Sequence, residues 1–203
     1  MYIAIAGNIG SGKTTLATLL AHHYGWEVHY DGEEENPYLA DFYDNMREWS
    51  FNLQIFFLQR RYKNILDIHK NTNSVIQDRT IYEDACIFAP NLLGMGLMSP
   101  RDFDTYKSLY DLMMTLVPPP SLLIYLKASV PTLVRQIQKR GREYENSIRI
   151  DYLQSLNNRY DQWIDTYESK CLTINVDSLN FSENSEDLSI VIDKINVEVN
   201  GLF

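Results

Sequence analysis

The segment that most constrains this chain is residues 7–14, which read GNIGSGKT and match the pattern G-x-x-x-x-G-K-[ST]. A short apolar run precedes it, and residues 14–24 follow with leucines at helical spacing. A strand, a glycine loop and a helix in this order allow backbone N–H groups and the helix dipole to surround phosphate oxygens. The segment therefore predicts a site for the phosphates of a nucleoside triphosphate.

Two residues of this segment and a second motif have expected tasks. Lys13 is placed to reach the terminal phosphates, and Thr14 offers its hydroxyl to a magnesium ion. Asp78-Arg79 ends an apolar run that is typical of a strand. Its carboxylate would approach the magnesium, and its guanidinium would stabilise charge on the transferring phosphoryl group. The alternative for Asp78-Arg79 is a surface ion pair.

The rest of the chain alternates apolar runs with helical patterns. Prolines and glycines between positions 90 and 100 predict a loop. Strands and helices in alternation predict a parallel sheet covered on both faces, with ligand sites at the carboxyl ends of its strands. We therefore expect an α/β fold with one domain over residues 1–203. After the first strand and helix, the expected strands are 26–30, 74–77, 122–126 and 172–176, and the expected helices lie within 37–70 and at 81–89, 101–116, 130–139, 148–168 and 188–199.

The densest basic cluster lies near residue 140, where Arg140 and Arg142 flank Gly141. A glycine between two arginines favours a mobile lid that closes over a triphosphate, and we place this lid at about residues 140–147. A solvated basic helix end is the alternative. With this lid, the expected ATP-binding residues are Gly7, Asn8, Ile9, Gly10, Ser11, Gly12, Lys13, Thr14, Thr15, Arg140 and Arg142.

An acidic stretch follows the second expected strand. Asp31, at the end of that strand, is placed to accept the proton of a hydroxyl group that attacks a phosphate. Residues 33–35 are all glutamate, and such a run more commonly forms a solvated acidic face. Asp31 is therefore the candidate general base.

Composition limits the possible partners. The net charge of −9 opposes a sequence-independent grip on DNA or RNA, because that binding needs clustered lysine and arginine. No apolar run approaches the length of a membrane span. Cys86 and Cys171 match neither a zinc spacing nor a disulfide framework, and the first strand leaves no room for a leader peptide. We therefore expect a cytoplasmic protein that binds neither nucleic acid nor a membrane.

Five further segments carry a family resemblance: ENPYLADFY at 35–43, WSFNLQ at 49–54, DRTIYED at 78–84, LLIYL at 122–126 and KRGREYE at 139–145. Together with GNIGSGKT, and in this order, they resemble the deoxynucleoside kinase family, which includes deoxycytidine, deoxyguanosine and deoxyadenosine kinases. The resemblance covers nearly the whole chain. It implies a P-loop kinase fold with a five-stranded parallel sheet, helices on both faces and an arginine-containing lid. It also implies ATP, Mg²⁺, a deoxynucleoside acceptor and a homodimer.

The resemblance assigns the sugar side of an acceptor site. It implies that Asp31 is the base acting on the 5′-hydroxyl of the substrate, with Arg79 beside it and Asp78 near the magnesium. Tyr43 and Glu145 would hold the 3′-hydroxyl, and Tyr43 would also exclude a 2′-hydroxyl.

The resemblance also assigns the base side. Gln54 would contact the edge of the nucleobase and Phe88 would stack on it. Arg61 and Asp84 match a pair that lines the base pocket in deoxycytidine and purine-type members and that thymidine-preferring members typically lack. The match favours a purine deoxynucleoside, with deoxycytidine possible. The pocket would be shaped by Leu39, Phe42 and Phe57.

The chain departs from the family pattern at three places. The usual base is Glu followed by Pro, whereas this chain has Asp31-Gly32, so either the shorter carboxylate acts or Glu33 replaces it. Gln136 stands where the lid often begins with an arginine. Asn36 stands where some members carry a tryptophan, which leaves the base contacts open.

Two other functions share part of this pattern. A nucleoside monophosphate kinase of the thymidylate kinase type has a similar phosphate loop, Asp-Arg motif and arginine lid. Its anionic acceptor would be repelled by Asp31, Glu33 and Glu34, so the acidic stretch favours a nucleoside acceptor. In a non-catalytic P-loop module, the lid arginines and Asp31 would have no clear task.

Overall fold

The computed structural model describes residues 1–201, except for the side chains of residues 34, 146, 147 and 200. Five strands form a sheet in the order β2-β3-β1-β4-β5, and every neighbouring pair is parallel. The expected five-stranded parallel sheet is therefore confirmed. The strands are β1 (Tyr2–Gly7), β2 (Glu27–His29), β3 (Val75–Asp78), β4 (Leu122–Lys127) and β5 (Cys171–Asn175).

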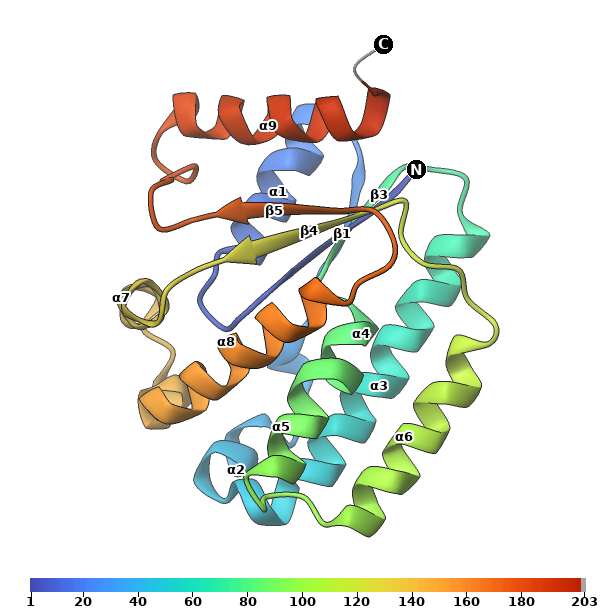
Figure 1. Cartoon of the computed structure of the whole chain (residues 1–203), viewed down its shortest axis with the longest axis vertical. Coiled ribbons are helices and arrows are strands. Elements are labelled where there is room, and N and C mark those ends of the chain that lie inside the picture. The colour runs from blue at the N-terminus through green and yellow to red at the C-terminus, as the bar shows by residue number, and fades with distance from the viewer. Residues whose placement is uncertain (202–203) are drawn as a thin grey trace.

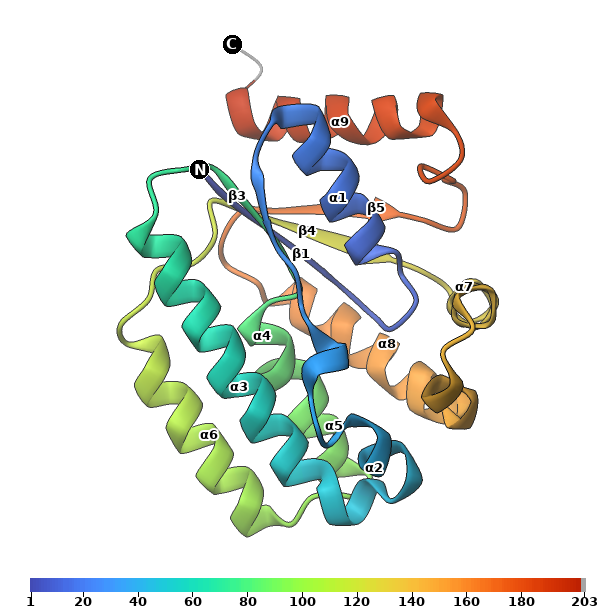
Figure 2. The same cartoon turned by 180° about the vertical axis from the view of Figure 1, so that it is seen from behind.

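Helices cover both faces of the sheet (Figure 1). Helices α1 and α9 lie on one face, and helices α3 and α8 lie on the other with α4 and α5. Helix α6 packs outside α3, as the reverse view shows (Figure 2). Within residues 1–201, no helix combines the length and the apolar character that crossing a membrane requires. The helices are α1 (Lys13–Tyr24), α2 (Leu39–Asp44), α3 (Met46–Lys70), α4 (Ile81–Glu83), α5 (Ala89–Gly94), α6 (Pro100–Met114), α7 (Val130–Arg140), α8 (Ile150–Asp165) and α9 (Ser185–Asn200), with a π-helix η2 (Asp84–Phe88) and two 3-10 helices, η1 (Glu33–Glu35) and η3 (Glu143–Ser147).

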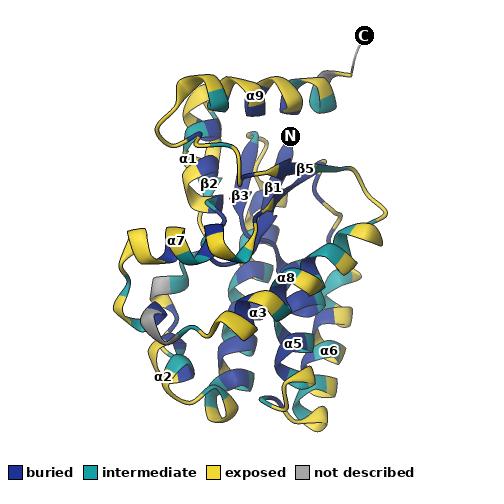
Figure 3. Ribbon diagram, turned by 60° about the vertical axis from the view of Figure 1, so that its left-hand side comes forward, coloured by how far each residue is buried: buried dark blue, intermediate teal, exposed yellow. Residues whose placement is uncertain are grey.

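Strand β1 forms the centre of the core because both of its faces are buried. Ile3 and Ile5 point to the side of α1 and α9, where they pack with Leu16 and Leu20. The alternate residues Tyr2, Ala4 and Ala6 point to the side of α3 and α8. Figure 3 shows the buried residues gathered on the sheet and on the inner faces of the helices. A strand buried on both faces fixes the position of the loop that follows it.

The chain departs from expectation at Pro90. The sequence predicted that the helix begun at residue 81 would stop at 89 and that a loop would follow. Instead, η2 continues into α5, which ends at Gly94. Pro90 lies inside this continuous run, directly after the π-type bond from the Ala89 N–H to the Asp84 carbonyl oxygen, and the shifted hydrogen bonding of the π-helix accommodates a residue without an N–H.

Candidate active site

The phosphate loop turns sharply between β1 and α1. Gly10 and Gly12 have positive φ values of 83° and 91°. A Cβ atom on Gly10 would lie 2.9 Å from the carbonyl oxygen of Leu133 in α7, so even alanine would collide there. The loop is therefore glycine-rich for steric reasons as well as for its conformation.

An open groove separates the phosphate loop from the lid. Gly10, Gly12, Lys13, Thr14 and Thr15 line one wall, as expected. The lid supplies basic side chains to the other wall, so the groove suits a polyanion. Its remaining lining residues are Gln136, Lys139, Arg140, Arg142, Ser182 and Glu183.

Four residues of the loop that were expected to bind ATP do not line this groove. The amide of Asn8 donates to the Leu153 carbonyl oxygen at 3.1 Å and to Asn157 at 2.7 Å, so Asn8 ties the loop to α8. Ser11 lines an adjoining hollow, and Gly7 contacts Leu126 of β4. The fourth residue, Ile9, lines the acceptor cavity described below.

Lys13 is buried under the loop, and its Nζ donates to the Asn8 carbonyl oxygen at 3.0 Å. Burial, together with the nearby Arg79, lowers the pKa of Lys13 to about 7. A phosphate in the groove would favour the charged ammonium, because an opposite charge stabilises it.

Thr14 and Asp78 form a pair at the edge of the groove. The Thr14 hydroxyl donates to Oδ2 of Asp78 at 2.6 Å. The other oxygen, Oδ1, is buried and has no hydrogen-bond partner among the described residues. Burial raises the pKa of Asp78. A hydroxyl beside an unsatisfied carboxylate oxygen is a donor set that fits Mg²⁺, which prefers oxygen ligands.

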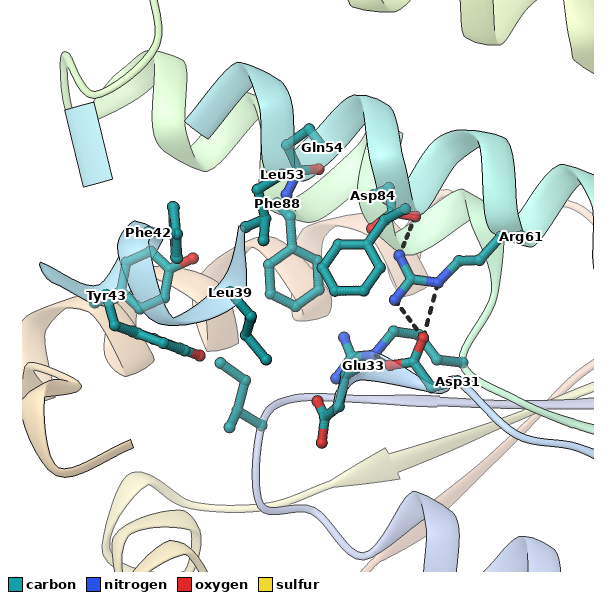
Figure 4. A pocket seen from close by; sticks show the side chains of 14 residues that line it. Asp31, Glu33, Leu39, Phe42, Tyr43, Leu53, Gln54, Arg61, Asp84 and Phe88 are labelled. Carbon is teal, nitrogen blue, oxygen red and sulfur yellow. Dashed lines mark hydrogen bonds and ion pairs between the residues drawn. The ribbon is translucent and has the colours of Figure 1, made fainter. Parts of the chain in front are cut away.

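A second cavity is lined by Arg79 and Asp31 (Figure 4). It contains every residue expected in the acceptor site except Glu145. Three of its residues, Ile9, Leu53 and Tyr152, had no predicted role there. The lining consists of Ile9, Asp31, Glu33, Leu39, Phe42, Tyr43, Leu53, Gln54, Phe57, Arg61, Arg79, Asp84, Phe88 and Tyr152.

Asp31 lies between two arginines in this cavity. Oδ1 of Asp31 accepts hydrogen bonds from Nε and Nη2 of Arg61, at 3.1 Å and 2.6 Å. Oδ2 forms an ion pair with Nε of Arg79 at 2.9 Å. Burial alone would raise the pKa of the Asp31 carboxyl, but Arg61 and Arg79 lower it below its usual value. Asp31 is therefore held as a carboxylate.

The base-side residues expected from the sequence converge from α3 and η2. Arg61 also donates through Nη1 to Asp84, and its guanidinium stacks over Phe57 at 4.3 Å. Burial raises the pKa of Asp84 to about 6 despite the opposing effect of Arg61. Gln54 is buried, and its Oε1 has no hydrogen-bond partner among the described residues. Phe88 lies against the Arg79 guanidinium at 4.9 Å. These groups form an apolar pocket with polar groups available to a ligand.

The lid lies against the mouth of this cavity. Arg142 forms an ion pair with Glu33, and Arg140 forms one with Glu145. The rings of Tyr43 and Tyr144 stack with their centroids 5.8 Å apart. Glu145 is buried but does not line the cavity, in contrast to the expectation, because Arg140 holds its carboxylate. The side chain of Glu34 lies outside the described residues.

Comparison with known proteins identifies the family. A family model described as "Deoxynucleoside kinase" matches residues 3–200. The chain belongs to the deoxynucleoside kinase family. The family, the kinase fold and the ATP-dependent deoxynucleoside kinase activity expected from the sequence are thereby confirmed.

Individual relatives of the kinase match over nearly its full length. It is 42% identical to the deoxyguanosine kinase of Bacillus subtilis (strain 168), over 92% of this chain and 91% of that protein. It is 34% identical to the deoxyadenosine/deoxycytidine kinase of the same organism, over 95% and 90% of the two chains. The solved structure of deoxyadenosine kinase from M. mycoides with bound dATP superposes with a TM-score of 0.85 at 29% identity, over 97% of this chain and 99% of that one.

Sequence reasoning also missed a buried residue beneath the phosphate loop of the kinase. Glu83 is fully buried beneath the phosphate loop, where its carboxylate accepts hydrogen bonds from the Gly7 N–H at 3.1 Å and the Thr80 N–H at 2.7 Å. The Tyr160 hydroxyl lies 2.7 Å from the same carboxylate. Thr80 and Glu83 form a capping box at the start of α4. The T-x-x-E spacing within DRTIYED is a recognisable signal for that box.

The capping box also stabilises an unusual backbone. Arg79, which directly precedes Thr80, has a φ of 69° and is the one non-glycine residue with positive φ within residues 1–201. Such a conformation costs on the order of 1 kcal/mol and persists where neighbouring contacts enforce it. The Arg79 N–H donates to the Ile5 carbonyl oxygen at 2.9 Å, which ties the turn to β1. The turn therefore aims the Arg79 side chain at Asp31.

Proposed function

We propose that the kinase transfers the γ-phosphate of ATP to the 5′-hydroxyl of a purine 2′-deoxynucleoside and that it uses deoxycytidine less well. The observation that carries this proposal is the acceptor cavity, where Asp31 and Arg79 lie beside the base-side group of Gln54, Arg61 and Asp84. A carboxylate beside an apolar pocket with a few polar groups suits a neutral hydroxyl compound with a planar base. The identity of 42% with a deoxyguanosine kinase supports a purine.

The reaction needs a group that removes a proton and groups that stabilise charge. In the proposed mechanism, the Asp31 carboxylate takes the proton of the 5′-hydroxyl as that oxygen bonds to the γ-phosphorus. The bond between the γ-phosphorus and the bridging oxygen breaks, and its electron pair leaves with ADP. Arg79, which contacts Asp31, stabilises the charge on the moving phosphoryl group.

The structure favours Asp31 over Glu33 as this base. Asp31 is buried in the cavity and contacts Arg79. Glu33 is part of the cavity lining, but its carboxylate pairs with Arg142 of the lid. A carboxylate that must exchange partners when the lid moves is less suited to hold a fixed position beside the 5′-hydroxyl.

On the donor side, we propose that Lys13, Arg140 and Arg142 hold the triphosphate of ATP in the basic groove. Thr14 and Asp78 would hold Mg²⁺, which supplies positive charge to neutralise the phosphate oxygens when bound. Their own contribution is a hydroxyl and an unsatisfied carboxylate oxygen at the edge of the groove.

On the sugar side, we propose that Tyr43 and Glu145 bind the 3′-hydroxyl and that Tyr43 leaves no room for a 2′-hydroxyl. Tyr43 lies in the cavity lining. Glu145 pairs with Arg140, so binding of the sugar would require that ion pair to rearrange as Arg140 turns toward phosphate. Sugar binding and lid position are therefore linked in this proposal.

We further propose that the kinase forms a single domain with a lid at about residues 140–147 and works as a homodimer in the cytoplasm. The outer side of α6 exposes Leu109 and Leu112, and Leu116 beyond it is 70% exposed. Adjacent exposed leucines favour a protein contact at this face. Cys86 and Cys171 are free thiols, which suits a reducing compartment.

A panel of acceptors with MgATP tests the proposed substrate. Deoxyguanosine, deoxyadenosine, deoxycytidine, thymidine, guanosine and dGMP would be compared by chromatography of the products. We expect the highest kcat/KM for the purine deoxynucleosides, followed by deoxycytidine. Arg61→Ala should lower the use of purine deoxynucleosides much more than ATP binding. A preference for thymidine or dGMP would contradict the proposal. So would an Arg61→Ala variant in which the use of purine deoxynucleosides and the binding of ATP are weakened equally.

A further inference from the structure

Arg61 contacts both of the acidic groups on its side of the cavity. Its Nε and Nη2 donate to the same oxygen of Asp31, while Nη1 donates to Asp84 (Figure 4). The exposed fraction of its side chain is 3%. A single guanidinium therefore joins the residue proposed to take the hydroxyl proton to a residue proposed to face the nucleobase.

We infer that Arg61 makes the rate of phosphoryl transfer depend on the nucleobase, because a base that accepts hydrogen bonds from Arg61 draws it away from Asp31. The inference rests on the proposed function, in which Asp31 is the general base. It goes further by assigning to Arg61 a positioning task in the chemical step.

Two arginines hold the carboxylate of Asp31. Arg61 donates hydrogen bonds to Oδ1, and Arg79 forms an ion pair with Oδ2. Hydrogen bonds from a charged donor stabilise a carboxylate and make it a weaker proton acceptor. With both arginines in place, Asp31 is therefore restrained as a base, and release of one arginine would make it more reactive.

Arg61 has N–H groups left over for a ligand. A guanidinium has five N–H groups, and Asp31 and Asp84 take three of them among the described residues. Two remain for a ligand in the cavity that Arg61 lines. The ring of Phe57 lies under the guanidinium at 4.3 Å, and this flat contact tolerates a sliding movement.

The placement of Gln54 connects this arginine to a nucleobase. Gln54 and Arg61 are seven residues apart on α3, which puts them on the same face of the helix two turns apart. Both line the cavity, and Oε1 of Gln54 has no hydrogen-bond partner among the described residues. A purine held by Gln54 would therefore have Arg61 within the same pocket wall.

Two simpler roles for Arg61 make different predictions. If Arg61 only bound the nucleobase, removing the base from the substrate would raise KM and leave kcat unchanged. If Arg61 only held Asp31 in place, kcat would be insensitive to the identity of the acceptor. Coupling through Arg61 predicts that loss of the nucleobase lowers kcat as well.

The experiment compares 2′-deoxyguanosine with 1,2-dideoxy-D-ribose, a sugar that has the same 5′-hydroxyl and no base. Separate kcat and KM values would be measured for both in the wild-type enzyme at saturating MgATP. We expect kcat for the base-free sugar to be on the order of tenfold lower or more, because Arg61 stays on Asp31. Equal kcat values would overturn the inference without affecting the proposed function.

A paired variant locates the effect in Arg61. Arg61→Met with Asp84→Asn removes the bridge without leaving Asp84 as an unpaired buried charge, and Asp84→Asn alone is the matched control. We expect the ratio of the two kcat values to approach one in the double variant and to persist in the control. A ratio unchanged in a folded, ATP-binding double variant would overturn the inference. Failure of the wild type to phosphorylate deoxyguanosine would overturn the proposed function as well.

Discussion

The donor groove and the acceptor cavity both adjoin a hollow lined by Thr14, Asp31, Glu33, Asp78 and Arg142, but they depend on different parts of the chain. One wall of the groove comes from a single short segment, residues 10–15. The cavity is assembled from η1, α2, α3, η2 and α8, and it depends on side chains that are buried. Changes in the two regions should therefore affect different steps of the reaction.

The difference also concerns charge. In the groove, four basic residues (Lys13, Lys139, Arg140 and Arg142) outnumber the one acidic lining residue, Glu183, although Arg140 and Arg142 pair with Glu145 and Glu33 outside the lining. In the cavity, Arg61 and Arg79 are balanced by Asp31 and Asp84 within the protein. Such a site suits a neutral ligand, because its buried charges are already paired and need no charge from the ligand. The electrostatics thus separate an anionic donor from a neutral acceptor.

The largest effect is expected in the acceptor cavity. Asp31→Asn removes the proposed base and should lower kcat by ~100- to 10,000-fold, with ATP affinity preserved. Initial rates and ATP titrations measure the two quantities. Glu33→Gln is the matched control, since it removes a second carboxylate of the same cavity. Near-normal turnover in Asp31→Asn combined with a collapse in Glu33→Gln would assign the base to Glu33.

The corresponding change in the donor groove is Gly10→Ala. The new Cβ would meet the Leu133 carbonyl oxygen in a backbone conformation with positive φ. Strain of about 1–3 kcal/mol should raise KM for ATP on the order of tenfold, while KM for the nucleoside is retained. Gly25→Ala is the control, because Gly25 also has positive φ but no atom lies within 4 Å of the added Cβ. An equal rise in KM for ATP and in KM for the nucleoside in Gly10→Ala would show that the groove and the cavity do not act independently.

A smaller effect is expected where the regions join. Glu83→Gln replaces a carboxylate that binds Gly7 and Thr80, so it should loosen the phosphate loop and the Arg79 turn together. We expect the free energy of unfolding to fall by about 1–3 kcal/mol and kcat to fall more than either KM rises. Tyr160→Phe, which removes a neutral hydroxyl that contacts this carboxylate and the Gly7 carbonyl oxygen, should have a milder effect. Loss of stability with kcat unchanged would limit Glu83 to a structural role.

The smallest effect concerns pH. The pKa of Asp84, raised to about 6 by burial, exceeds that of an unfolded aspartate at about 4. The stability contributed by this group is full below about pH 4 and is lost as pH rises through about 6. Relative to Asp84→Asn, the wild type should therefore lose on the order of 1 kcal/mol between pH 4 and 7 in chemical denaturation. The same pH dependence of the free energy of unfolding in the wild type and in Asp84→Asn would contradict this effect of burial on Asp84.

The two regions were not equally predictable from the sequence. Lys13 and Thr14 lie in the groove as expected because a phosphate loop is a local structure whose residues follow one another. The fold followed from the alternation of strands and helices, and only the helical stretch through Pro90 was misjudged. Local patterns therefore identified the groove and the sheet.

The acceptor cavity required a family resemblance, because no local pattern states which distant side chains will meet. Ile9 was assigned to ATP from its place in the loop, yet it faces the cavity. Leu53 lies one turn before Phe57 and could have been found from the helical period, but Tyr152 of α8 carried no signal. The shared contact of Asp31 with Arg61 depends on tertiary packing across 30 positions of the chain. Such a contact is visible only in the folded protein.

The most direct test of the separation between groove and cavity measures both ligands on the same two variants. Calorimetric titrations of ATP and of deoxyguanosine would be made with Asp31→Asn and Gly10→Ala, together with kcat for each. We predict that Asp31→Asn binds ATP normally and turns over slowly, whereas Gly10→Ala binds deoxyguanosine normally and ATP weakly. Loss of ATP affinity in Asp31→Asn, or of deoxyguanosine affinity in Gly10→Ala, would contradict the account.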